Sequence, residues 1–100
     1  MTEKQIYEYV VEHCPYCALC GSTQNLHIHH ILYRSEGGQT SLWNLIRLCE
    51  KCHIKVHSSK RYWQPKLERF LKKVVIYECN YSKKIIDEIL SVPYKYEDKN

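Results

Sequence analysis

The fold is decided by residues 17–57, which read CALCGSTQNLHIHHILYRSEGGQTSLWNLIRLCEKCHIKVH. Two Cys-x2-Cys pairs stand near the ends of this stretch, histidines lie between them, and a His-x3-His spacing directly follows the second pair. Thiolates and imidazoles are the ligands that zinc and similar divalent ions prefer. The stretch therefore predicts metal binding, and its arrangement predicts two sites rather than one.

Length and charge set the limits around this stretch. A chain of 100 residues makes one small domain, and such domains often need a metal or a crosslink to be stable. We expect a single domain over residues 1–100, with a metal-binding core at 17–57 and a helical extension at 60–92. Fifteen Lys and Arg against eleven Asp and Glu give a net charge of +4, which permits an anionic partner without requiring one.

The six cysteines fit either a secreted disulfide scaffold or a metal-binding protein. The N-terminal residues MTEKQIYEYVVEH are charged and contain no continuous apolar run, so we expect no signal peptide, and no stretch of the chain predicts a membrane span. We therefore expect an intracellular, cytoplasmic protein. In that reducing compartment, paired cysteines bind metal more often than they form disulfides.

The first cysteine pair can be assigned in two ways, because CPYCALCG contains both Cys14/Cys17 and Cys17/Cys20. We assign Cys17 and Cys20, since Gly21 follows them and permits the tight turn that brings backbone N–H groups to the sulfurs. Cys14 is then expected to be a small buried residue. These assignments predict one structural zinc ion, held by Cys17, Cys20, Cys49 and Cys52.

The central stretch predicts a hairpin flanked by helices. Residues 26–33 are rich in β-branched and aromatic side chains and predict a strand, and residues 44–48 predict the returning strand. The polar, Gly-rich residues 34–41 between them predict a loop. A helix is expected over residues 50–59, after the second cysteine pair. Before the hairpin, residues 3–12 predict a helix that begins at a capping box formed by Thr2 and Gln5.

Beyond residue 60 the composition becomes aromatic and basic. Pro65 predicts the start of a helix, because proline is favoured in a first helical turn. One face of this helix is apolar and is expected to enter the core: Leu67, Phe70, Leu71 and Val74. The opposite face is basic, and solvation and phosphate contact are equal alternatives for it: Lys66, Arg69, Lys72 and Lys73.

The last predicted element is a helix over KKIIDEILS, with Ser82 as its N-cap and Pro93 as its end. The residues after it, YKYEDKN, are expected to fray.

Four histidines cluster where the predicted hairpin returns to the helix: His29, His30, His53 and His57. His53 and His57 are four residues apart, so on a helix they project from one face and can bind one ion. This predicts a second metal centre. His27 is expected to take no part in it, and Asn44 on its own predicts a turn or a cap.

Together these residues resemble the HNH endonuclease superfamily, the ββα-metal nucleases, in its zinc-stapled form. The matching motifs occur in the family's order: Cys17-x2-Cys20-Gly21, His29-His30-Ile31, Gly37-Gly38, Asn44-Leu45 and Cys49-x2-Cys52-His53-x3-His57. The resemblance covers about two fifths of the chain and leaves the first helix and the residues after 60 unassigned. It implies a small α+β fold of the ββα-metal (His-Me finger) type.

The resemblance implies a metal-dependent DNA endonuclease with a catalytic set of His30, Asn44 and His53. His30 would be the general base, and His29, His53 and His57 would hold one divalent ion: magnesium, manganese, nickel or zinc. Asn44 would either orient His30 or contribute an oxygen to the metal. The alternative functions are an inactive DNA-binding module of the same fold and a zinc-stapled protein-interaction module. The C-terminal helices are candidates for contact with DNA, a second copy or a partner protein.

Overall fold

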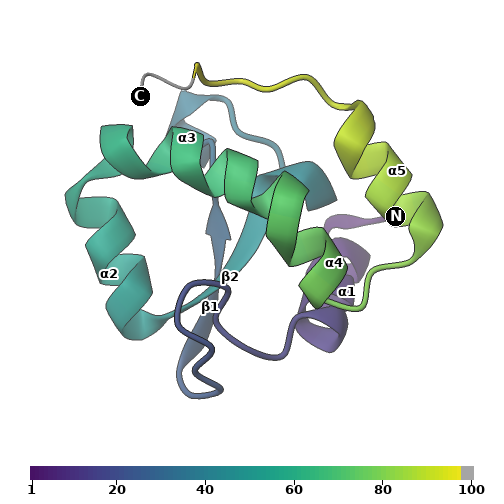
Figure 1. Cartoon of the computed structure of the whole chain (residues 1–100), viewed down its shortest axis with the longest axis horizontal. Coiled ribbons are helices and arrows are strands. Elements are labelled where there is room, and N and C mark those ends of the chain that lie inside the picture. The colour runs from purple at the N-terminus through teal and green to yellow at the C-terminus, as the bar shows by residue number, and fades with distance from the viewer. Residues whose placement is uncertain (98–100) are drawn as a thin grey trace.

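The computed structural model describes residues 1–97 as a two-stranded hairpin surrounded by helices (Figure 1). The expected α+β fold and the expected order of helix, strand, strand and helix are confirmed. In chain order the elements are α1 (Glu3–His13), β1 (Leu26–His30), β2 (Leu45–Cys49), α2 (Glu50–Ser58), α3 (Lys60–Phe70), a π-helical turn η3 (Leu71–Val75), α4 (Ile76–Glu78) and α5 (Lys83–Ser91).

The ends of α1 and α5 follow from local capping. The Thr2 side chain accepts a hydrogen bond from the Gln5 backbone N–H, and the Gln5 side chain accepts one from the Thr2 backbone N–H, as the predicted capping box requires. The Ser82 side chain likewise accepts from the Ile85 backbone N–H and begins α5. Both predictions are confirmed, because capping depends on residues only three positions apart.

The hairpin is antiparallel and fully paired, from Leu26 opposite Cys49 to His30 opposite Leu45. Directly opposed residues lie on the same face of the sheet, so His29 shares one face with Ile46, whereas His30 shares the other with Leu45. α2 and α1 lie on opposite sides of the hairpin (Figure 1). α2 contacts the face of His29, and α1 contacts the face of His30.

The connection between the strands is more regular than predicted. β1 ends at His30 instead of residue 33. The connection contains two short 3₁₀ turns: Arg34–Glu36 lies in the predicted loop, whereas Leu42–Asn44 follows that loop, so that β2 begins at Leu45 instead of residue 44. The first turn ends at Gly37, whose φ of 86° lies in the left-handed region. Gly38 permits close packing, since a Cβ there would lie 1.8 Å from the Leu32 carbonyl oxygen.

The prediction that a helix begins at Pro65 was wrong. α3 begins at Lys60, and Pro65 lies inside it. An internal proline removes one backbone hydrogen bond and crowds the carbonyl group four residues earlier, and the burial of neighbouring side chains such as Leu67 offsets this cost. The predicted core positions Leu67 and Leu71 are fully buried, but η3 then shifts the register, so that Val75 and Ile76 are more deeply buried than Val74.

The basic face of α3 is not the uniformly solvated surface that the sequence allowed. Lys72 is 5% exposed and donates a hydrogen bond to the Val92 carbonyl oxygen. Arg69 donates to the Tyr96 carbonyl oxygen over 2.9 Å, and its guanidinium lies 4.3 Å from the Tyr94 ring centroid. Two of the four predicted basic residues therefore contact the C-terminal segment.

The same contacts correct the expected fraying after α5. The backbone N–H groups of Lys95 and Tyr96 donate to the Glu68 carboxylate over 2.6 and 3.1 Å. This part of the segment is held against α3, while residues 98–100 of the predicted frayed end lie outside the described residues. One apolar cluster includes residues from α1, the hairpin, α3 and α5, among them Val10, Leu48, Leu67 and Ile89.

Candidate metal centres

The four cysteines assigned to zinc lie together at the base of the hairpin. The Sγ atoms of Cys17, Cys20, Cys49 and Cys52 all lie within 4.8 Å of one another, and those of Cys20 and Cys49 are 3.6 Å apart. A tetrahedral zinc ion with Zn–S bonds of about 2.3 Å separates its sulfurs by about 3.8 Å. All four thiols are free, so the donor set and its spacing fit a structural zinc ion.

Backbone geometry supports the thiolate form of Cys17 in this cluster. Gly21 has a φ of 78° and donates its N–H to the Cys17 carbonyl oxygen over 2.9 Å, which closes the tight turn that the sequence predicted. Burial raises the pKa of Cys17, but backbone N–H groups of Cys49, Cys20 and Leu19 outweigh it and lower that pKa to about 7.

The second cluster joins His29 on β1 to His53 and His57 on α2. One ring nitrogen of each lies within 4.8 Å of the others, and the Nε2 atoms of His53 and His57 are 3.1 Å apart. Tetrahedral coordination with metal–nitrogen bonds of about 2.1 Å separates ligand nitrogens by about 3.4 Å. The helical spacing of four residues produces this convergence, as the sequence predicted.

His29 is a buried histidine with one unpaired ring nitrogen. Its side chain is 2% exposed, and its Nε2 has no hydrogen-bond partner among residues 1–97. Burial, together with the nearby His53, His57 and His30, lowers the pKa of His29 to about 3. A buried neutral imidazole with a free nitrogen fits a metal ligand, because coordination satisfies the nitrogen that the protein leaves unpaired.

Tyr33 is a site residue that the sequence analysis missed. Its hydroxyl oxygen lies 3.0 Å from Nδ1 of His57, and its ring packs edge-on against His29 at a centroid distance of 5.6 Å. The signal available in the sequence was its place three residues after the two histidines, at the start of a turn. Its contact with a helix 24 positions away depends on tertiary structure.

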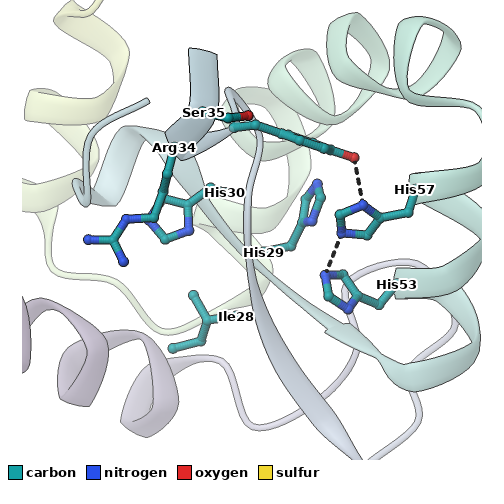
Figure 2. A pocket seen from close by; sticks show the side chains of 8 residues that line it. Ile28, His29, His30, Arg34, Ser35, His53 and His57 are labelled. Atoms are coloured by element: carbon teal, nitrogen blue, oxygen red, sulfur yellow. Dashed lines mark hydrogen bonds between the residues drawn. The ribbon is translucent and has the colours of Figure 1, made fainter. Parts of the chain in front are cut away.

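His30 lies beside the cluster on the other side of β1. Figure 2 shows His29, His53 and His57 turned toward one another, with His30 and Arg34 across the strand from them. Nε2 of His30 is 3.0 Å from the Thr40 hydroxyl oxygen, and its ring lies edge-on to Tyr7. Burial and the positive charge of Arg34 lower the pKa of His30, which favours the neutral imidazole.

One pocket of about 300 Å³ is lined by residues from both sides of β1. His30 and the three clustered histidines all line it, together with Ile28, Tyr33, Arg34 and Ser35. His27 does not line the pocket, although its ring stacks on His53 at a centroid distance of 5.3 Å.

Asn44 is 1% exposed and contacts backbone rather than the histidines. Its Oδ1 accepts from the Leu32 N–H over 2.8 Å, while Nδ2 donates to the carbonyl oxygens of Leu32 and Gln39 over 3.0 and 2.9 Å. Both ends of the amide are therefore occupied. Asn44 fixes the connection that follows His30, and its oxygen is already used by the backbone.

The segment that holds this arrangement matches the model of a known family. Residues 14–59 match the family model described as HNH endonuclease, and this segment contains both clusters, His30 and Asn44. The chain is also similar to a protein named Anaredoxin from Nostoc sp. (strain PCC 7120 / SAG 25.82 / UTEX 2576), with 33% identity over 58 residues. That alignment covers 58% of this chain and 74% of the relative. No solved structure matches the chain.

Proposed function

Because the chain belongs to the HNH endonuclease family, we propose that it is a metal-dependent endonuclease that hydrolyses phosphodiester bonds of DNA. The proposal is supported above all by one observation, the convergence of three imidazoles beside a fourth in one pocket. Hydrolysis of a phosphodiester requires a proton acceptor for water and a cation near the phosphate oxygens. The pocket offers residues for both tasks.

His29, His53 and His57 would hold the divalent ion through neutral ring nitrogens. A bound ion would supply Lewis-acid stabilisation of the charge that develops on the phosphate and on the leaving 3′ oxygen. Imidazoles suit nickel and zinc best, and manganese and magnesium, which prefer oxygen ligands, are the other two candidates. Tyr33 would keep the His57 ring in place, because a hydrogen bond to one ring nitrogen orients the other.

His30 would act as the general base. When Nε2 carries the proton and donates to Thr40, Nδ1 keeps its lone pair and can remove a proton from water. The lowered pKa of His30 keeps the imidazole neutral before the reaction. Asn44 would be a positioning residue, since its three hydrogen bonds fix the loop that begins directly after His30.

The remaining parts of the chain would support this centre. The four thiolates would hold zinc and fasten the two ends of the hairpin to each other, without taking part in chemistry.

The shared apolar cluster of α1, the hairpin, α3 and α5 supports a single domain over the whole chain. None of the helices within residues 1–97 is long and apolar enough to cross a membrane. The cytoplasm, with its reducing conditions, is our proposed compartment.

Conversion of supercoiled plasmid to nicked or linear product tests the proposal. We expect cleavage that requires an added divalent ion and falls at least 100-fold in a His30→Ala variant, because general-base catalysis contributes about 10²–10⁴-fold. His13→Ala is the matched control, since His13 lies at the end of α1 and hydrogen-bonds the Tyr9 backbone, outside the pocket.

Equal cleavage by the wild type and a folded His30→Ala variant would refute the base assignment. Salt-dependent DNA binding without cleavage at any metal concentration would favour the inactive binding module. Absence of both binding and cleavage would favour the protein-interaction module.

A further inference from the structure

Arg34 lines the histidine pocket on the same side of β1 as His30 (Figure 2). It begins a short 3₁₀ turn that Glu36 ends. The Glu36 carboxylate accepts a hydrogen bond from the Gln64 side chain on α3 over 2.9 Å, and Gln64 is 4% exposed, so the turn is anchored to the core. The backbone of Arg34 is therefore fixed beside the pocket, whereas its side chain is 63% exposed and can reach a ligand.

A carboxylate from α1 contacts this guanidinium. Nη2 of Arg34 donates a hydrogen bond to Oε1 of Glu3 over 3.0 Å. Glu3 and Tyr7 are four residues apart in α1, so they lie on one face of that helix. The Tyr7 ring on that face lies edge-on to the His30 ring at a centroid distance of 6.3 Å. The same face of α1 therefore contacts both Arg34 and His30, and it brings one negative charge to this side of the pocket.

The ion pair of Arg34 and Glu3 is suited to an exchange of partners. The two side chains are 63% and 62% exposed, so water and salt screen their attraction and hold the pair weakly. A guanidinium donates to the oxygens of a phosphate in the same planar geometry as to those of a carboxylate. A phosphate that enters the pocket can therefore take the place of the Glu3 carboxylate on Arg34.

We propose that Arg34 binds a phosphate of the DNA strand beside His30, and that Glu3 is an internal competitor for the same guanidinium. The choice of DNA as the ligand rests on the proposed function. In the free protein Glu3 holds the guanidinium at the edge of the pocket. In the complex the phosphate replaces the carboxylate, and Glu3 is released to solvent. Arg34 is then a substrate-binding residue, and Glu3 lowers the affinity for DNA without taking part in the reaction.

Binding of a short fluorescent DNA duplex tests the role of Arg34. Zinc-loaded protein is titrated without any added divalent ion, and fluorescence polarisation is recorded at several concentrations of potassium chloride. We expect Arg34→Ala to bind about tenfold more weakly and to reduce the slope of log affinity against log salt by about one, because one phosphate contact is lost. Arg34→Lys retains the charge, so it should keep the slope and lose less affinity. Lys83→Ala is the control, since Lys83 is 91% exposed on α5 and lies outside the pocket.

The same titration tests the role of Glu3. Glu3→Gln should bind DNA about two- to fivefold more tightly, because an exposed ion pair no longer competes for the guanidinium. Glu12→Gln removes an equal charge from an exposed position at the other end of α1 and should leave the affinity nearly unchanged. An equal gain in both variants would indicate general repulsion of DNA and would overturn the competition.

Plasmid cleavage by the same variants separates this phosphate site from the proposed nuclease activity. Unchanged affinity and salt slope in Arg34→Ala, with cleavage intact, would overturn the phosphate site and leave the nuclease standing. Binding that depends on Arg34 without any cleavage would support the phosphate site and contradict the nuclease. A wild-type protein that binds no DNA even at low salt would overturn the phosphate site as well. Zinc content and thermal unfolding verify that each variant folds, and substitution of these exposed side chains leaves the core intact.

Discussion

Individual side chains decide whether the histidine cluster can hold an ion in the right geometry. Tyr33 is the clearest case, because its hydroxyl contacts a ring nitrogen of His57 that faces away from the cluster. We predict that Tyr33→Phe weakens divalent-ion binding about 10–100-fold, the usual cost of losing such a supporting hydrogen bond. Isothermal titration of the zinc-loaded protein with manganese measures this effect directly.

Tyr62→Phe is the matched control, since Tyr62 is 59% exposed and lies over Lys66 on α3. An unchanged manganese affinity in Tyr33→Phe would show that the hydroxyl does not support the ligand. A loss of equal size in both variants would point to a general effect on the fold.

Asn44 is a second single residue with a large expected effect, because its side chain hydrogen-bonds the loop backbone. Asn44→Ala leaves one N–H and two carbonyl oxygens of the loop without their partner, so we predict a loss of about 2–4 kcal/mol in the free energy of unfolding. Urea denaturation measures the loss, and Gln39→Ala serves as control because only the Gln39 backbone carbonyl takes part. A change below about 0.5 kcal/mol, the usual size for a surface position, would contradict this assignment.

At the scale of elements, α3 organises the C-terminal segment through a buried carboxylate. Glu68 is 4% exposed and accepts backbone hydrogen bonds from Lys95 and Tyr96. We predict that Glu68→Ala lowers the free energy of unfolding by about 1–3 kcal/mol and speeds proteolysis after residue 91. Glu12→Ala, an exposed position on α1, should change it by less than about 0.5 kcal/mol. Equal resistance of Glu68→Ala and the wild type to protease would contradict the contact.

Elements were predictable where their causes are local. The capping residues Thr2 and Ser82, the cysteine spacings and the four-residue spacing of His53 and His57 act within a few positions and needed no tertiary information. The internal Pro65 and the π-helical turn after Phe70 were not predictable in this way. Burial against other elements decides both, and local propensity disfavours both.

In the candidate site, too, some residues were predictable from local sequence, whereas others depend on tertiary structure. The cysteines and histidines that we propose as ligands could be selected from spacing and chemistry, and the structure brings each set together. Tyr33 and Thr40 could not be selected, because their contacts with His57 and His30 depend on how the loop folds back. Lys72 was misassigned for a related reason, since its Val92 partner lies in a distant segment.

At the scale of the whole molecule, the sulfur-bound zinc ion is expected to hold the fold together. The described chain has a small core and two strands, and the four thiols join the segment before β1 to the start of α2. We predict that removal of zinc by a strong chelator abolishes most of the helical signal in far-ultraviolet circular dichroism. Removal of an ion from the histidine cluster alone should leave that signal unchanged. Retention of the full signal without any metal would contradict a structural role for zinc.

The proposed activity depends most on two ions bound by different side chains, and native mass spectrometry counts these ions directly. The predicted result is one zinc ion in the purified protein and a second divalent ion after saturation with manganese. The double variant His53→Ala/His57→Ala should retain the first ion and lose the second. A wild-type protein that never binds a second ion, or a double variant that still binds it, would contradict the account.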